Sequence, residues 1–504
     1  MNTASTLHSF MSLRGVWVFL LASLLALATV FTTGCGFTPP TVSTVQGFTS
    51  VTLLLSSTTN DQLSKVFIAF NSISLTNQSG KTVNLYTGSP NSAGFYAGYE
   101  FIHLNGNAEP LVTTIVPQDV YTSATVTILY SSYMSCVVYN APSNPGGLTI
   151  FVNTPFTLVQ GPVPVTVNVP APITVTGTAM GVSLNMLLSQ SALSACTNYG
   201  SVQSMPTFNV TPVVFSPQPT NSENGKETNL DGQISFLDTA GNHFTLVLAD
   251  GQTLSVKSND STIYQGVNGF SALSAGTLVD MDAAIQWDGS QLATRIAAVD
   301  ADTTNLTMET GPVLQTAASE PVLNALVREQ QGYLSGTPFP FGLETPFSIT
   351  NAVYQISEQF ANLQDLPFPA TFNAANIFGG QNVYITTHAL TIGNAPTYYP
   401  ASTITLMPQT INGTVFGASS SGAFQVYSVS LASYDLPTIL TMEPGQSYTL
   451  NNPSTVEVYV DSNTQLLNKQ PLAVGGLFRF NGLLFNDAGT MRMDCGEVND
   501  GVAE

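Results

Sequence analysis

Residues 230–236 read LDGQISF and residues 411–416 read INGTVF, and in both stretches a glycine enters a strand directly after a turn. Other matches follow these two in the same order along the second half of the chain. Similarity that returns in a fixed order indicates a repeated structural unit, because chance matches do not keep their order. These stretches therefore decide how we expect the C-terminal half to fold.

The later matches extend the repeat to three copies. Residues 254–264 (LSVKSNDSTIY) match residues 458–466 (VYVDSNTQL), with a partial copy at 347–354 (FSITNAVY). A glycine-containing segment and an alanine-led strand also recur, at 273–279, 377–383 and 474–478, and at 293–299 and 401–407. We predict three units, at 230–303, 304–409 and 410–496, of which the middle one carries an insertion, followed by a tail at 497–504.

Strand patterns also dominate the chain before residue 216, after its amino-terminal apolar run. Valines alternate with polar residues over residues 163–169, and turn clusters such as 77–80 separate apolar runs. Helical periodicity is confined to residues 186–195, 320–331 and 350–363. The sequence therefore predicts a mostly β protein with few short helices.

A polar stretch with two prolines, residues 216–229, separates the two halves and is predicted to be a linker. The short, evenly spaced strands before it predict an antiparallel β-sandwich over residues 48–215.

Two family resemblances support this organisation. Residues 51–55, 116–128 and 182–188 resemble a family of bacterial exported domains of unknown function with a transthyretin-like sandwich, although residues 57–61 (STTND) replace that family's Asp-Ala-Pro. The repeats resemble a second family of unknown function, whose units are small barrels of about five strands. The resemblance implies an N-terminal sandwich followed by three small β-barrel-like repeats, and it implies no activity. The recurring glycines are expected where tight corners need positive φ or close backbone approach.

The amino terminus resembles a bacterial lipoprotein signal. An apolar run at 15–31 precedes Cys35, although Thr32 stands where that family usually has Leu. The resemblance implies a signal peptide at 1–34, lipidation of Cys35 and a tether at 35–47, and hence an exported protein held on a membrane of the cell envelope. A plain secretory signal with an incidental cysteine is the alternative.

Export would place the other cysteines in an oxidising compartment. Cys136 and Cys196 fall in the same predicted domain and form a candidate disulfide. Cys495 is then left over, and we favour a buried free thiol over a reactive or intermolecular one.

The charge of the chain excludes nucleic acid as a partner. It has 30 acidic and 10 basic residues, a formal charge of −20, and no cluster of Lys and Arg that could neutralise phosphates. A Gly-x-Ser-x-Gly motif is absent, and the His residues fall in different predicted units, so a nucleophilic triad is not supported.

Acidic residues offer a second route to chemistry. Asp280 and Asp282 lie two apart on a predicted strand and so share a face, for which we favour a solvated outer face over a catalytic pair. Four glutamates are scattered through the middle unit without visible pairing: Glu309, Glu320, Glu344 and Glu358. Asp300 and Asp302 alternate as in calcium loops but lack the glycine and distal glutamate, so a turn is favoured over calcium. No other cofactor is expected.

Aromatic residues give the remaining candidate. Trp287 lies beside a predicted hairpin turn, where an exposed ring could stack on a sugar, and core packing is the alternative. We predict a cell-envelope lipoprotein with a non-enzymatic binding or scaffolding role toward polysaccharide or other envelope proteins. The alternatives are a carbohydrate-binding surface protein or a hydrolase that uses carboxylates of the middle unit.

Overall fold

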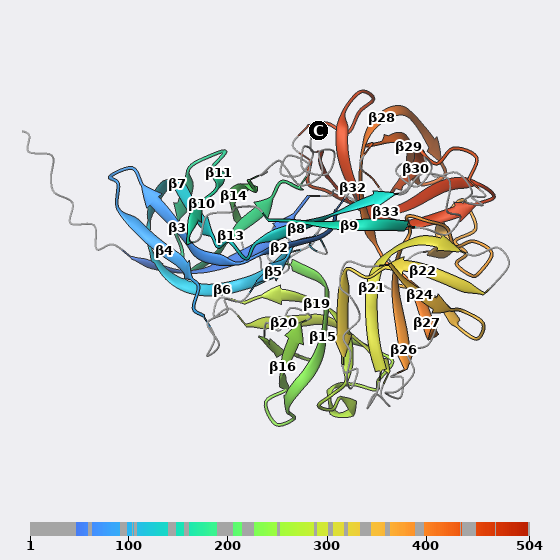
Figure 1. The fold of residues 1–504 in the computed structure, drawn as a ribbon, viewed down its shortest axis with the longest axis horizontal. Helices are drawn as coiled ribbons and strands as arrows, with labels where there is room; N and C mark the ends of the chain where they lie inside the picture. The colour runs from blue at the N-terminus through green and yellow to red at the C-terminus, as the bar shows by residue number, and fades with distance from the viewer. Residues whose placement is uncertain are drawn as a thin grey trace, which may run out of the picture. The chain divides into compact units, whose positions relative to one another are not determined.

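The computed structural model describes residues 47–501 in large part. The residues outside the description within this range are 59–62, 91–97, 103, 105–107, 140–147, 156–160, 189–204, 214–225, 249–252, 287–289, 301–305, 317–320, 333–343, 358–362, 389–397, 434, 436–449 and 469. The described chain is mostly β, which confirms the predicted fold class (Figure 1). Within it no helix combines the length and the apolar character needed to cross a bilayer.

The N-terminal part contains three sheets. The first has the order β11-β14-β13-β1-β6, from β1 (Phe48–Ser57), β6 (Ala108–Pro117), β11 (Thr166–Asn168), β13 (Ala179–Met186) and β14 (Thr207–Val213). The second has the order β10-β7-β3-β4 with β12 on β7, from β3 (Phe70–Asn77), β4 (Thr82–Thr87), β7 (Asp119–Ile128), β10 (Val163–Pro164) and β12 (Ile173–Val175). The third has the order β5-β2-β8-β9, from β2 (Leu63–Ile68), β5 (Tyr99–Glu100), β8 (Tyr133–Tyr139) and β9 (Leu148–Pro155). Most pairs are antiparallel, and β1–β13 and β11–β14 are parallel.

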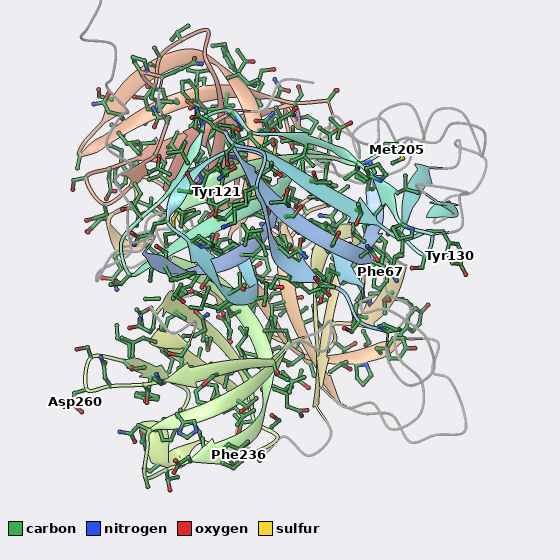
Figure 2. The ribbon with its side chains drawn as sticks, turned by 90° about the vertical axis from the view of Figure 1, so that its left-hand side faces the viewer. Phe67, Tyr121, Tyr130, Met205, Phe236 and Asp260 are labelled. Carbon is green, nitrogen blue, oxygen red and sulfur yellow. The ribbon has the colours of Figure 1, made fainter. Side chains whose placement is uncertain are left out.

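One apolar core joins these sheets as a sandwich. Phe70 of β3 and Phe208 of β14 are fully buried, and each has its ring about 6 Å from that of Phe101, at 6.0 and 5.9 Å. Tyr121 is also in this core, and its hydroxyl donates to the carbonyl of Pro117 at 2.9 Å. By contrast, Tyr130 is 59% exposed at the end of a strand (Figure 2).

Three barrels follow, and all have the same strand topology. The first has β15 (Lys226–Asp238), β16 (His243–Leu248), β17 (Thr253–Lys257), β18 (Ile263–Gln265), β19 (Leu278–Ile285) and β20 (Gln291–Asp300). The second has β21 (Leu306–Thr316), β22 (Val322–Leu326), β24 (Glu344–Ser348), β25 (Val353–Ile356), β26 (Asn382–His388) and β27 (Tyr399–Leu406), with β23 (Glu329–Gly332) added beside β21. The third has β28 (Gln409–Ser421), β29 (Phe424–Leu431), β30 (Thr455–Val460), β31 (Gln465–Leu466), β32 (Leu477–Asp487) and β33 (Thr490–Asp500).

Each barrel closes through one parallel pair. The order in the first barrel is β17-β16-β15-β19-β20, and β20 returns to pair with β17, while β18 lies parallel to β20 on its other side. The pairs β24–β27 and β30–β33 close the second and third barrels in the same way. The repeat read from the sequence is therefore a repeat of closed five-stranded barrels.

The turn that precedes the fourth barrel strand is the same in all three copies. Its glycine has a positive φ and donates its N–H to the carbonyl of a residue in the first barrel strand at 2.7 Å. The three pairs are Gly276 with Ile234, Gly380 with Val313, and Gly475 with Val415. A side chain would strain this backbone, which explains why the glycine-containing segment recurs.

A second repeated glycine lies in the first strand of each barrel, at Gly232, Gly311 and Gly413. None of the three has a positive φ, so close approach between backbones and not turn geometry requires glycine here. A Cβ at position 413 would lie 2.5 Å from the carbonyl oxygen of Ser430, and one at 311 would overlap the carbonyl oxygen of Leu326. The neighbouring strand therefore crosses too closely for any side chain.

Residues 320–331 form strands and not the helix that their periodicity predicts. β22 pairs with β21 and β24, and β23 pairs with β21, so pairing within the barrel overrides the local pattern. The predicted helix at 350–363 is likewise wrong over β25, which pairs with β27. The described helical residues are Leu188 and two short 3₁₀ turns, η2 (Phe270–Ala272) and η3 (Leu363–Asp365).

Residues 357–381 connect β25 to β26, and part of this insertion packs on the third barrel. The ring of Phe368 lies 4.8 Å from that of Tyr459, and the guanidinium of Arg492 lies 5.4 Å from the Phe368 centroid. The amide of Gln381 donates to the carbonyl of Leu484 at 2.8 Å, which ties the end of the insertion to β32.

Substituting Gly413→Ala should lower the free energy of unfolding by about 1–3 kcal/mol, because the new methyl group would force β28 away from β29. Urea unfolding measures this loss. Gly417→Ala in the same strand is the control, since its Cβ would meet only the Ser428 side chain at 3.3 Å. Equal losses in the two variants would contradict the close-approach explanation.

Candidate functional site

Two carboxylates and one guanidinium form a buried cluster on the first barrel. Asp280 and Asp282 are alternate residues of β19 and therefore share a face, and Arg295 pairs in register with Asp282 from β20. Arg295 Nη2 lies 2.8 Å from Asp280 Oδ2, and Arg295 Nε lies 3.0 Å from Asp282 Oδ2. The three residues are only 7–8% exposed. The expectation of a solvated outer face at these aspartates is therefore wrong, because both side chains are buried and paired with Arg295.

Burial and charge shift the protonation of this cluster. Burial raises the pKa of Asp280, and the nearby Asp282 raises it further, while the Arg295 guanidinium opposes both effects. The two carboxylates together hold the pKa of Arg295 above its ordinary value despite burial. The cluster thus contains a permanent cation between two acids.

Arg295 uses its donors within the first barrel. Its Nε and Nη2 bond the two aspartates, and its Nη1 donates to the Oε1 of Gln265 in β18 at 3.3 Å. Asp280 Oδ2 is occupied by this contact, whereas Asp280 Oδ1 is buried and has no hydrogen-bond partner in the described structure. A buried acceptor without a partner is destabilising and needs an explanation.

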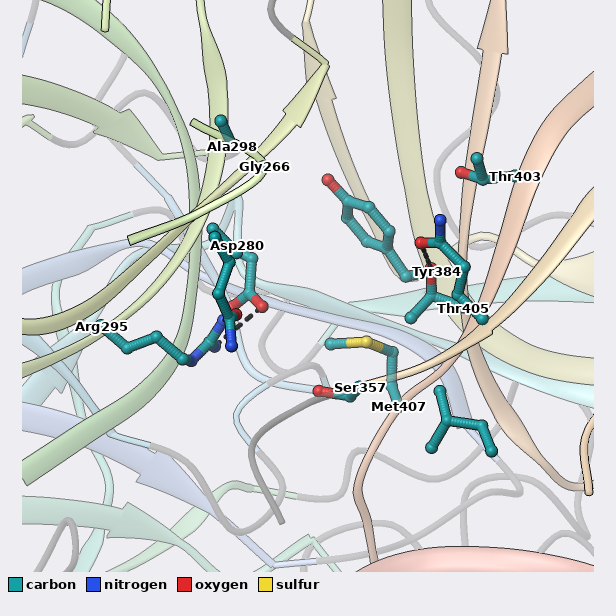
Figure 3. A pocket seen from close by; sticks show the side chains of 13 residues that line it. Gly266, Asp280, Arg295, Ala298, Ser357, Tyr384, Thr403, Thr405 and Met407 are labelled. Atoms are coloured by element: carbon teal, nitrogen blue, oxygen red, sulfur yellow. Dashed lines mark hydrogen bonds and ion pairs between the residues drawn. The ribbon is translucent and has the colours of Figure 1, made fainter. Parts of the chain in front are cut away.

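This cluster forms one wall of a cleft of about 490 Å³. Asp280 and Arg295 of the first barrel face Tyr384, Thr403 and Thr405 of the second (Figure 3). Gln265 and Gln355 also line the cleft. Ser357 and Met407 also line it. The cleft is large enough for a small organic molecule and is rich in polar side chains.

The two walls come from equivalent positions of the repeat. Asp280 pairs with Ala297 on the first barrel, and Tyr384 pairs with Thr405 on the second. Gln265 lies opposite Ala297 and Gln355 lies opposite Thr405, from the matching edge strands β18 and β25. The barrels therefore face each other through the same surface, although the residues on it differ.

Apolar and hydroxyl contacts hold the second wall in place. Leu278, Tyr384 and Met407 form a small buried cluster that joins the two barrels beside the cleft. The hydroxyls of Thr386 and Thr403 lie 2.6 Å apart across β26 and β27. Thr405 Oγ1 donates to Gln355 Oε1 at 3.5 Å. The polar side chains of this wall are thus supported by neighbouring strands.

A different acid is perturbed in the third barrel. Burial, together with the nearby Asp461, raises the pKa of Asp494 to about 6. Cys495 beside it is a buried free thiol, as the sequence analysis favours, and burial raises the pKa of this thiol. These two residues are not among those that line the cleft.

The other site residues predicted from the sequence fall outside what the structure describes. Cys35, Cys196, Trp287 and Asp302 lie outside the described residues, as do the side chains of Cys136 and Asp300 and of the four glutamates of the middle unit. Within the described chain, His, Cys, Asp and Glu side chains form no group of three or more that could hold a metal ion.

The sequence analysis missed Arg295, Gln265, Gln355 and Tyr384. One signal was available for Arg295: it is one of only 10 basic residues and lies in the repeated alanine-led strand at 293–299. If this strand is paired with the strand that holds Asp280 and Asp282, the guanidinium falls between the two acids. No comparable sequence pattern points to the residues of the second wall, because a local pattern does not show which surfaces of two barrels face each other.

A comparison with protein families matches residues 231–297 to a domain of unknown function (DUF5666). The matched segment spans most of the first barrel and contains Gln265, Asp280, Asp282 and Arg295. The prediction of an unknown-function domain in the C-terminal part is thus confirmed for this barrel. No curated protein matches the chain.

Substituting Arg295→Met should destabilise the protein by about 3–5 kcal/mol at neutral pH, because two buried carboxylates would lose their counter-ion. The folded-state pKa of Asp280 is already raised, so the folded protein takes up a proton there before the unfolded chain does as the pH falls. The difference in unfolding free energy between the wild type and Arg295→Met should therefore shrink as the pH falls from 7 toward 4. Urea unfolding of both proteins between these pH values measures this difference.

Arg479→Met is the matched control, because Arg479 is only partly buried and its Nε donates to the carbonyl of Asp500 at 3.1 Å. A loss at Arg295 no larger than at Arg479, or one independent of pH, would contradict the role assigned to the cluster.

Proposed function

We propose that this chain is an exported cell-envelope protein that binds a ligand without transforming it, and that the cleft between the first two barrels is the binding site. The observation that carries the proposal is the unpartnered Oδ1 of Asp280 in the wall of a 490 Å³ cleft. A ligand donor at that atom would remove the penalty of a buried, unsatisfied acceptor.

The residues of the cleft support binding better than catalysis. Of the described residues that line it, Asp280 is the only acid, Arg295 is already ion-paired, and neither His nor Cys is present. Hydrolysis of a glycosidic bond needs two carboxylates flanking one bond, and covalent catalysis needs a nucleophile beside a base. The alternative of a hydrolase would have to use the glutamates of the middle barrel.

A carbohydrate-binding surface protein is the second candidate. Amide and hydroxyl groups such as those of Gln265, Gln355 and Thr405 favour it, because sugars are recognised through several polar contacts. This form of binding would not depend on Trp287.

The leader sequence supports attachment to the envelope. We propose that the segment up to residue 34 is removed and that Cys35 is lipidated, as in the lipoproteins that it resembles. The N-terminal sandwich, with its resemblance to exported transthyretin-like domains, would then lie next to the tether at 35–47.

Radioactive palmitate should label the protein in bacteria, and Cys35→Ala should abolish the label because no other residue carries the signal's acceptor thiol. Autoradiography of the immunoprecipitated protein measures the incorporated label. Equal labelling of the variant, or none of the wild type, would remove the lipid anchor.

Substituting Ala297→Trp should abolish ligand binding, because the indole would fill the cleft from β20. The test is a thermal-unfolding panel of glucose, N-acetylglucosamine, D-glucamine, ethanolamine, acetate and phosphate at millimolar concentration. At least one probe should raise the wild-type unfolding temperature, since binding to the folded state alone stabilises it.

Val474→Trp is the control, because Val474 is 60% exposed and does not line the cleft. It should keep the wild-type response. No response in the wild type, or an equal response in Ala297→Trp, would contradict a binding site in the cleft.

A further inference from the structure

We propose that the ligand of this cleft is an organic ammonium compound that also carries hydroxyl or amide groups, such as an amino polyol. The inference rests on the proposed function, because it names the class of molecule that the same cleft binds.

The charge of the cluster is the first argument. Asp280 shares its counter-ion with Asp282, because Arg295 Nη2 bonds Asp280 Oδ2 and Arg295 Nε bonds Asp282 Oδ2. The guanidinium therefore neutralises Asp280 only in part. A buried charge without a partner costs several kcal/mol, whereas a bound cation would neutralise it.

The position of the vacant acceptor is the second argument. Arg295 directs its Nε, Nη1 and Nη2 to Asp282, Gln265 and Asp280, so each of its three nitrogens already has a hydrogen-bond partner within the barrel. Asp280 Oδ1 is buried and lacks any donor, and Asp280 is one of the residues that line the cleft. An ammonium group there would form a charge-assisted hydrogen bond, which is about twice as strong as a neutral one.

The opposite wall offers neutral contacts to the rest of the ligand. Tyr384 faces the carboxylate of Asp280 across the cleft (Figure 3). Its ring can contact a cation through its π face. The amide of Gln355 and the hydroxyls of Thr403, Thr405 and Ser357 can bond to hydroxyl or amide groups. None of these is a cationic side chain, so the opposite wall supplies no second counter-ion to Asp280.

The volume of the cleft favours an organic cation over an inorganic ion. A single ion would leave most of 490 Å³ unfilled, whereas a six-carbon amino polyol reaches both walls. The absence of a group of three or more metal-ligating side chains in the described chain agrees with this choice.

Protons compete with the ligand for the carboxylate of Asp280. The charged and titratable side chains described around Asp280 are Asp282 on its own strand, Arg295 on β20 and Tyr384 across the cleft on β26, while Asp231 is the residue of β15 paired in register with Asp280. Burial raises the pKa of Asp280, so acid neutralises the cleft without a ligand. Affinity for the ammonium should therefore fall as the pH is lowered, and binding at the lower pH should release a proton.

The experiment compares D-glucamine with D-sorbitol by isothermal titration calorimetry at pH 7.5. The two polyols differ mainly in one terminal group, ammonium or hydroxyl. D-glucamine should bind the wild type at least about tenfold more tightly, and Asp280→Asn should remove that preference while leaving the weak binding of sorbitol unchanged. Asp494→Asn is the control, since this acid is not among the residues that line the cleft.

Equal or tighter binding of sorbitol to the wild type would overturn the inference but not the proposed function, provided that Ala297→Trp abolishes it. A preference for D-glucamine that survives in Asp280→Asn would also overturn it. Failure of every probe to bind the wild type would refute both proposals. Asp282→Asn, which leaves Asp280 in place, should keep a preference for the amine and thereby separates a specific contact from a general loss of negative charge.

Discussion

Closure of each barrel by a parallel strand pair is the constraint on which the rest of this structure depends. The pairs β17–β20, β24–β27 and β30–β33 join the third strand of each unit to the last, so the barrel strands have few unpaired edges. Closing so few strands requires sharp curvature and close crossings. Gly232, Gly311 and Gly413 permit these crossings, and the positive-φ glycines before the fourth strand shape the turn.

The same closure determines where polar groups can gather. The inside of each small barrel is filled by apolar side chains such as Ile234, Phe244 and Ile296, so polar residues of the fourth and last strands lie on the outside. On the first barrel this outer surface holds Asp280, Asp282 and Arg295. The corresponding surface of the second barrel lies across the cleft from Asp280 and Arg295. A repeated unit has thus produced a polar site by pairing two copies of one surface.

The sequence was sufficient to predict the repeated units and their small-barrel form. Matches such as LDGQISF with INGTVF recur in order because the backbone needs glycine at the same place in each unit. Such a requirement is local and is therefore visible in a short stretch of sequence. The failed helix at 320–331 shows the limit of local patterns, because β22 and β23 form through pairing with strands that the pattern does not include. The burial of Asp280 and Asp282 could not be predicted for a related reason: it depends on tertiary contacts such as those with Arg295, which local alternation does not report. Arg295 was predictable in principle, since strand alternation and hairpin pairing place it opposite Asp282.

The central claim is that the cleft holds a ligand whose positive group lies against Asp280 Oδ1. A crystal structure of the protein grown with D-glucamine at neutral pH tests this most directly. The account predicts the ammonium nitrogen within about 2.7–2.9 Å of Asp280 Oδ1, with Arg295 still bonded to both aspartates. It would be contradicted by a protein side chain bonded to Asp280 Oδ1, or by a cleft closed through direct packing of the two barrels.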